Sequence, residues 1–182
     1  VVKVVTDSTS DLPADYAKSL EVTIVPLNVN FGTESFKDNV TITADDFYQR
    51  LTMGTVLPTT SQPSPGDFVE VYDRLGEDAD GIVSIHLSSK ESGTHNSAVQ
   101  ARGMTEATCP IEVVDSEQFS MGLGMIVIKA AEAAGRGASV EDVAAIARNA
   151  KRLSQCVASF DTLEYLERGG RIGKAKALVG SL

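Results

Sequence analysis

The sequence predicts an α/β fold, with a mostly parallel sheet flanked by helices and the start of a second α/β domain behind it. Three segments carry this prediction, beginning at residues 1, 81 and 111. Each runs from an aliphatic or β-branched stretch through a polar loop into a helical stretch. Strands and helices that alternate in this way form βαβ units, whose crossovers bring the strand-to-helix loops to one edge of the sheet.

The elements follow from local patterns along the chain. Strands are expected at residues 1–6, 81–86, 111–114 and 156–160. Helices are expected to begin near Pro13, to pass through Ala98 and Ala101, to run over 121–135 and to end near Leu153. Four helix starts place a capping side chain three residues before an acid, at Thr43, Ser64, Ser139 and Asp161.

The length of 182 residues accommodates one ordinary domain and part of another. We expect an N-terminal α/β domain over residues 1–150, and the beginning of the second domain over residues 151–182. The sequence ends in an apolar run that includes Leu178, Val179 and Leu182. Such a run without a polar tail favours a chain cut inside the second domain.

The composition argues against several classes of protein. A formal net charge of −9 opposes general binding to nucleic acid or to anionic membranes. No apolar stretch is long enough to span a bilayer, and residues 1–6 read as a strand rather than a signal peptide. We therefore expect a cytoplasmic protein without stable membrane insertion. No cofactor motif and no cluster with metal-ligand spacing is present, so neither a cofactor nor a metal is expected.

Three segments expected to be loops are rich in small hydroxyl side chains, at residues 6–10, 59–64 and 88–94. In open α/β sheets a ligand lies at the carboxyl ends of the strands, where helix N-termini favour an anion. Turns and caps alone account for Ser64 and Ser139. They account less well for three such segments in one chain, and we favour an anion site.

Two other readings of the same segments stay open. A serine-dependent lipid esterase would use Ser92 and His95, although no G-x-S-x-G elbow is present. His86, at the end of a strand, is more typical of a buried core residue than of a base. A small phosphate ligand would suit the hydroxyls, although the chain lacks a P-loop.

A basic segment at residues 168–176 contrasts with the acidic chain, because it holds four cations in nine residues. Two glycines stand directly before Arg171. They favour a tight turn that aims its guanidinium.

Taken in order, these motifs resemble the DegV family. The similarity extends over the whole chain, and the motifs are specific together although each is weak alone. They lie at residues 5–13, 60–64, 88–94, 114–116 and 161–174.

The resemblance implies a two-domain protein that holds a long-chain fatty acid between its domains. It further implies the binding subunit of a bacterial fatty acid kinase, which presents the acyl carboxylate for phosphorylation. Catalysis then belongs to the kinase, and this chain is a lipid-binding carrier in phospholipid metabolism rather than an enzyme.

The resemblance also assigns site residues. Thr60 and Ser92 are implied to bind the carboxylate, with Ser61 and the Gly93 N–H as neighbours. Arg171, accompanied by Arg168, is implied to face the kinase.

Two positions depart from the family pattern, since His95 replaces a usual tyrosine and Glu91 a usual apolar residue. Both change the polarity of the expected pocket mouth. Family members also continue past Leu182. That missing part supplies much of the acyl-chain tunnel.

Overall fold

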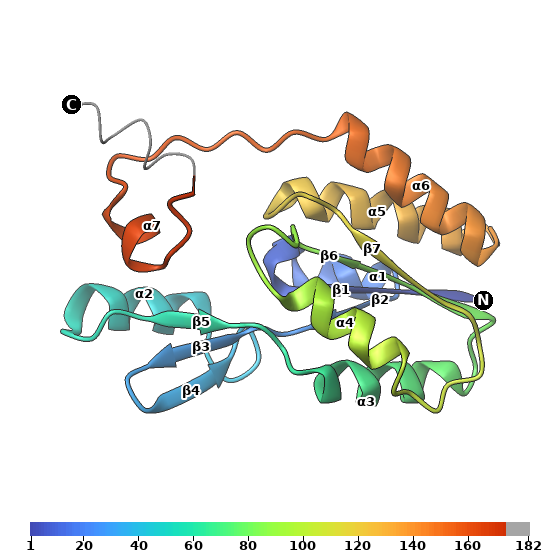
Figure 1. Cartoon of the computed structure of the whole chain (residues 1–182), viewed down its shortest axis with the longest axis horizontal. Helices are drawn as coiled ribbons and strands as arrows, with labels where there is room; N and C mark the ends of the chain where they lie inside the picture. The colour runs from blue at the N-terminus through green and yellow to red at the C-terminus, as the bar shows by residue number, and fades with distance from the viewer. Residues whose placement is uncertain (174–182) are drawn as a thin grey trace.

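The computed structural model describes residues 1–173, and its centre is a four-stranded parallel sheet with the order β2-β1-β6-β7 (Figure 1). This sheet confirms the predicted fold class. Val4 of β1 lies opposite Val22 of β2 and Val83 of β6, which fixes the register at the centre. The strands are β1 Val2–Asp7, β2 Val22–Val25, β6 Gly81–His86 and β7 Ile111–Asp115.

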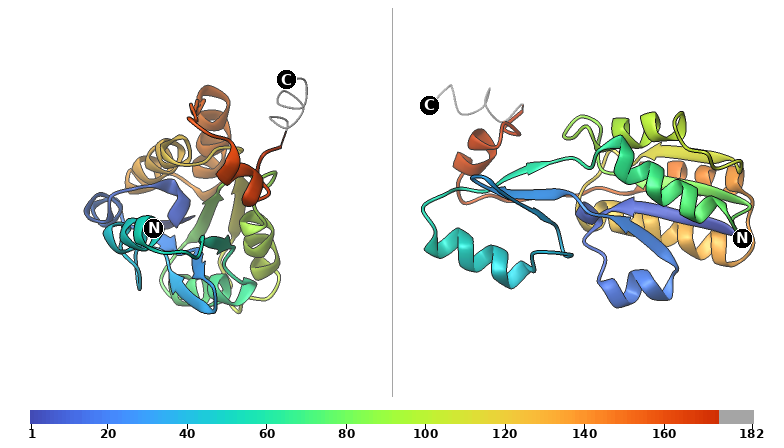
Figure 2. Two further views of the ribbon diagram at one scale, coloured as in Figure 1. Left: turned by 90° about the vertical axis from the view of Figure 1, so that its left-hand side faces the viewer. Right: turned by 90° about the horizontal axis from the view of Figure 1, so that it is seen from below.

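Helices cover both faces of this sheet, giving three layers (Figures 1 and 2). Because side chains alternate along a strand, Val2 and Val4 pack on one face and Val5 on the other. The Val4 face is covered by α1 Ala14–Ser19, α5 Met121–Gly135 and α6 Val140–Leu153; the Val5 face is covered by α3 Pro65–Gly76 and α4 Thr94–Arg102.

A second, smaller unit interrupts the main domain between β2 and α3. Its antiparallel sheet has the order β4-β3-β5, and α2 packs on it through a small apolar cluster that includes Val29, Phe31 and Ile42. Its elements are β3 Asn28–Phe31, β4 Glu34–Lys37, α2 Ala44–Met53 and β5 Thr59–Ser61. Residues 59–61, expected in a loop, therefore form a strand because they pair with β3.

Three of the four predicted helix caps are confirmed. Thr43 and Ser64 form reciprocal capping boxes, and Ser139 accepts a hydrogen bond from the Asp142 N–H. Asp161 was wrong as a cap, because α7 Glu164–Arg168 begins after Leu163 and the Glu164 N–H donates to Thr162 Oγ1.

The strand expected at residues 156–160 is also wrong. This segment lies in the linker between α6 and α7, defined here as residues 154–163, and none of it is in a strand. An extended segment becomes a strand only beside a partner strand, and none pairs with it among residues 1–173. The linker leads to α7, which lies beside α2 (Figure 1).

The apolar end at Leu178, Val179 and Leu182 lies outside the described residues. The domain boundary at residue 150 stays a prediction. Within the described chain, no helix combines the length and the apolar character needed to cross a membrane.

Candidate functional site

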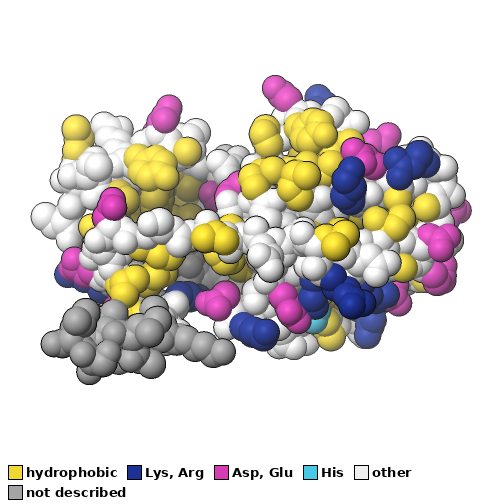
Figure 3. All heavy atoms as spheres, turned by 90° about the horizontal axis from the view of Figure 1, so that it is seen from above, with side chains coloured by type: hydrophobic (Ala, Val, Ile, Leu, Met, Phe, Trp, Pro, Cys, Tyr) yellow, Lys and Arg dark blue, Asp and Glu magenta, His cyan; other side chains and the backbone are white. Residues whose placement is uncertain are grey.

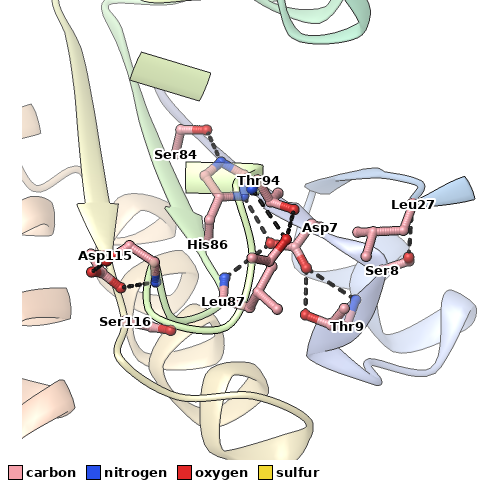
Figure 4. Close-up of polar contacts among 12 residues, drawn as sticks. Asp7, Ser8, Thr9, Leu27, Ser84, His86, Leu87, Thr94, Asp115 and Ser116 are labelled. Carbon is pink, nitrogen blue, oxygen red and sulfur yellow. Dashed lines mark hydrogen bonds and ion pairs between the residues drawn. The ribbon is translucent and has the colours of Figure 1, made fainter. Parts of the chain in front are cut away.

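The carboxyl end of the main sheet holds a buried polar network centred on Asp7, the last residue of β1 (Figure 4). One Asp7 carboxylate oxygen accepts hydrogen bonds from the Thr9 N–H and Oγ1, at 3.1 and 2.5 Å. The other accepts from His86 Nδ1 at 3.0 Å and from the Leu87 N–H at 3.1 Å. Asp7 therefore ties the loop after β1 to the loop after β6, and its four acceptor positions are filled.

The network continues from His86 to Ser84 and Tyr72. Burial raises the pKa of Tyr72 to about 12, so its hydroxyl donates to Ser84 Oγ at 2.8 Å. Ser84 Oγ lies 2.7 Å from His86 Nε2 and donates to it when Nδ1 donates to Asp7. With Nδ1 as the donor to Asp7, Tyr72, Ser84 and His86 each have a hydrogen-bond partner.

The pKa of Asp7 reflects two opposed effects. Burial raises it, but the hydrogen bond and the charge of His86, together with the hydrogen bonds from Thr9 and Leu87, prevail and hold it below its ordinary value. The order Asp7, His86, Ser84 matches that of hydrolase triads. Ser84 and His86 are nevertheless fully buried, which leaves no room for a substrate beside the hydroxyl. We assign the network a structural role, which agrees with His86 as a core residue.

Ser92 and His95 do not form the nucleophile and base of an esterase. Ser92 Oγ accepts from the Thr94 N–H at 3.2 Å and lies 2.9 Å from Thr94 Oγ1. No hydrogen bond joins Ser92 to His95 within residues 1–173. Partial burial lowers the pKa of His95, and the charges of His86 and Lys151 lower it further, against the raising effect of Asp115.

The N-terminus of α4 presents several free donors. Gly93 is the N-cap and has no side chain to cap the helix, whereas the Thr94 N–H is bound by Ser92 Oγ. The N–H groups of Gly93, His95 and Asn96 have no acceptor among the described residues. When Thr94 Oγ1 donates to Ser92, the Ser92 hydroxyl proton is free as well. These donors and the positive end of the helix dipole favour an anion.

Gln62 brings the hydroxyl-rich segment of β5 to this helix end. Its side-chain Nε2 donates to Ser97 Oγ on α4 at 3.1 Å. A Cβ placed on Gly93 would lie 2.2 Å from Gln62 Oε1, so glycine allows the close approach. The predicted convergence is confirmed for these two segments.

Thr60 and Ser61 lie on opposite faces of the small sheet. Thr60 is opposite Val29, and Ser61 is opposite Asn28. The Asn28 side chain donates to Ser61 Oγ at 3.3 Å, whereas Thr60 shares its face with Val29, which packs in the apolar cluster beneath α2. The structure therefore separates these neighbours in the sequence.

Thr60 lines a largely apolar groove between α2, β5 and α7, which we call the α2–α7 groove. Its volume is about 540 Å³, within the range of small-molecule pockets. Figure 3 shows hydrophobic side chains gathered at this end of the molecule. The groove is lined by Phe47, Leu51, Leu57, Pro58, Thr59, Thr60, Tyr165, Leu166, Arg168, Gly169 and Arg171.

Both arginines that we expected at a partner surface also reach this groove. Gly170 has a φ of +72°, and the Arg171 N–H returns to Leu166 O at 2.8 Å, which confirms the glycine turn. Arg168 pairs with Glu164 at 2.5 Å, whereas Arg171 has no carboxylate partner among residues 1–173. Over a hundred residues separate Arg171 from Thr60, so local patterns carried no signal of this proximity.

No three His, Cys, Asp or Glu side chains are arranged to hold a metal ion in the described part of the chain. The features of the site are thus hydroxyls, free backbone N–H groups, an apolar groove and two guanidinium groups.

Comparison with known proteins places this chain in a family. The family model described as "Uncharacterised protein, DegV family" matches residues 1–182. A DegV domain-containing protein of Caldanaerobacter subterraneus is 41% identical over 181 residues, which cover 100% of this chain and 64% of that protein.

Two solved structures are similar over the whole chain. A DegV family protein from Thermus thermophilus, described as fatty acid binding, has a TM-score of 0.85 and 42% identity. DegV from Bacillus subtilis, described as a fatty acid binding protein, has a TM-score of 0.89 and 34% identity. This chain covers 64% of the length of each. By its sequence and its fold, the chain belongs to the DegV family.

Proposed function

We propose that this chain binds a long-chain fatty acid, with the carboxylate at the N-terminus of α4 and the acyl chain along the α2–α7 groove. One observation carries the proposal: Gln62 joins the free donors around Ser92 and Gly93 to the strand whose Thr60 lines the apolar groove. An anion site beside an apolar groove suits an amphipathic acid. The fatty-acid-binding relatives support the same choice.

The two parts of the site contribute differently to affinity. Burial of the acyl chain contributes about 0.8 kcal/mol for each CH₂ group, so the groove supplies most of the binding free energy. The hydroxyls of Thr60 and Ser92 orient the carboxylate through charge-assisted hydrogen bonds. They do so without a permanent salt bridge, which would lower the reactivity of the carboxylate.

We further propose that the chain is a carrier that needs no cofactor and presents the carboxylate to a fatty acid kinase. Arg171, which has no carboxylate partner among residues 1–173, is free to engage such a partner. Arg171→Ala is therefore expected to retain fatty acid and to lose acyl-phosphate formation with a cognate kinase. Loss of fatty acid binding in this variant would show that Arg171 serves the groove that it lines rather than a partner.

We also propose that the protein is cytoplasmic. Its two cysteines, Cys109 and Cys156, are free thiols, as is usual in reducing compartments.

Calorimetric titration with palmitate and with methyl palmitate tests the binding site. Thr60→Ala and Ser92→Ala are expected to weaken palmitate binding by roughly 10- to 150-fold, since each loses a hydrogen bond to a charged group. Binding of the ester should change much less, because the ester has no negative charge to strengthen a hydrogen bond from either hydroxyl.

Ser19→Ala is a suitable control. It removes an exposed hydroxyl that bonds only to Tyr16 O, on α1. Equal losses of affinity for palmitate and for its methyl ester would show that the hydroxyls do not bind the carboxylate. Tight binding of inorganic phosphate without palmitate binding would favour a small phosphate ligand.

A further inference from the structure

The linker is tied to the main domain through the side chain of one residue, Gln118, in the loop between β7 and α5. Its Nε2 donates to Ser154 O at 3.2 Å, and its Oε1 accepts from the Cys156 N–H at 3.2 Å. A backbone N–H can only donate and a carbonyl can only accept, so the orientation of the amide is determined. One side chain here makes the pair of bonds that a neighbouring strand would make.

Beyond Ser154, which also bonds to α6, the described residues show little polar contact between the linker and the main domain. Among the described residues, the bond from the Cys156 N–H is the only hydrogen bond or ion pair between residues 155–173 and residues 1–153. Gly122 allows the linker to approach α5 closely, because a Cβ there would lie 3.2 Å from Cys156 Cβ. Among polar contacts, the attachment of the linker at Cys156, ahead of α7 and the groove wall that it forms, therefore rests on Gln118.

The backbone of Gln118 holds the opposite part of the site. Its carbonyl accepts from the Ser88 N–H at 2.9 Å and from Ser116 Oγ at 3.2 Å. Ser88 lies in the loop that leads from β6 to Ser92 and the N-terminus of α4. Gln118 thus contacts the segments that carry both halves of the proposed site.

The loop around Gln118 has an unusual backbone. Glu117 and Ser120 have φ values of +51° and +52°, a region that residues other than glycine rarely adopt. Strain of this kind persists only where surrounding contacts hold it. The conformation of this loop is therefore fixed by its surrounding contacts, and the loop can hold Gln118 in place.

We propose that Gln118 is a positioning residue, which sets α7 and its groove-lining residues Tyr165, Leu166 and Arg171 relative to the N-terminus of α4. It touches no ligand itself, and its functional part rests on the proposed fatty acid binding. Loss of its side-chain bonds frees the linker, moves the α7 wall and weakens retention of the acyl chain.

Cys156 is a built-in reporter of this contact, because its N–H is one of the two bonded groups. In a Cys109→Ser background it is the only thiol of the chain, which has two cysteines. Gln118→Met keeps the length of the side chain and removes both bonds. We expect about tenfold faster alkylation of Cys156 by iodoacetamide, and about tenfold weaker palmitate binding.

Two further variants sharpen the test. Ser154→Ala removes only the neighbouring bond from Ser154 Oγ to Ala150 O, of 3.0 Å, and should leave both readouts unchanged. Gln118→Glu can still accept from Cys156 but its charge repels Ser154 O, so an intermediate alkylation rate is expected. Circular dichroism establishes that each variant is folded.

The outcomes are separable. An unchanged alkylation rate in Gln118→Met would overturn the tether, and faster alkylation with unchanged palmitate affinity would overturn the positioning role. Absence of palmitate binding to the wild-type chain would instead overturn the proposed function. That failure would be seen before any variant is compared.

Discussion

Asp7→Asn is the substitution that most sharply tests the buried network at the carboxyl end of the sheet. The amide oxygen can still accept from Thr9, but its NH₂ group then faces the Leu87 N–H and His86 Nδ1. The two N–H groups of the amide would then face two other donors, in a fully buried position without acceptors. Asparagine is nearly isosteric with aspartate, so the change isolates hydrogen bonding and charge from packing.

The size of the expected loss in unfolding free energy follows from the number of buried donors left without acceptors. Each buried donor that loses its partner costs about 1–3 kcal/mol, so two cost about 2–6 kcal/mol. His86 can relieve its share by changing tautomer, because Nδ1 then accepts from the amide and Nε2 donates to Ser84. The backbone N–H of Leu87 can only donate, so it remains without an acceptor. We therefore expect a loss of about 1–3 kcal/mol, a substantial part of the stability of an ordinary domain.

Urea unfolding followed by circular dichroism measures this loss. The control is Asp78→Asn, which neutralises an exposed carboxylate and should change stability by less than about 0.5 kcal/mol. The slope of the transition should stay constant, so that the midpoint reports stability. Equal midpoints for the two variants would refute the view that the Asp7 carboxylate holds the two loops together.

Three other outcomes are expected. The folded-state pKa of Asp7 lies below its ordinary value of 3.8, so the stabilisation by its carboxylate is present above about pH 3.8 and is lost as the pH falls below that value. The difference in unfolding free energy between wild type and Asp7→Asn should therefore become smaller at low pH. Gly93→Ala should displace Gln62, break its bond to Ser97 and cost about 0.5–1.5 kcal/mol in urea unfolding. Gly135→Ala, at a helix position with no atom within 4 Å, should raise stability by about 0.4–1 kcal/mol; a loss would contradict the open space found there.

The main sheet and its helices could be predicted because their signals are local. The helix at Met121–Gly135 has the predicted bounds, and β6 has the predicted bounds as well. Capping boxes at Thr43 and Ser64 likewise depend on residues three apart. Such patterns need no knowledge of distant contacts.

The small sheet was missed although the sequence contains a hairpin signal. Residues 28–31 alternate polar and apolar side chains, and Gly32 with Thr33 forms the two-residue turn before β4, with a φ of +62° at Gly32. The strands are only four residues long, which weakens the pattern. Residues 156–160 show the opposite failure, because a strand-like composition does not supply a partner strand.

The candidate site could be predicted only in part. Hydroxyl-rich segments are visible in the sequence, and parallel topology brings the loops after β1 and β6 together. The contact between Gln62 and Gly93, and the place of Arg171 at the groove of Thr60, arise from tertiary packing across the two units. The separation of Thr60 from Ser61 follows from the register of β5, which composition does not determine.

The central claim is that hydroxyl and N–H donors at α4 hold an ionised carboxylate, and NMR of bound palmitate labelled with ¹³C at the carboxyl carbon tests it most directly. Hydrogen bonds to the charged form lower the pKa of a carboxyl group. We predict a bound resonance distinct from that of free palmitate, which titrates at lower pH than the free acid and moves back toward it in Ser92→Ala. A bound carboxyl that titrates like free palmitate, and is unaffected by Ser92→Ala, would contradict the assignment.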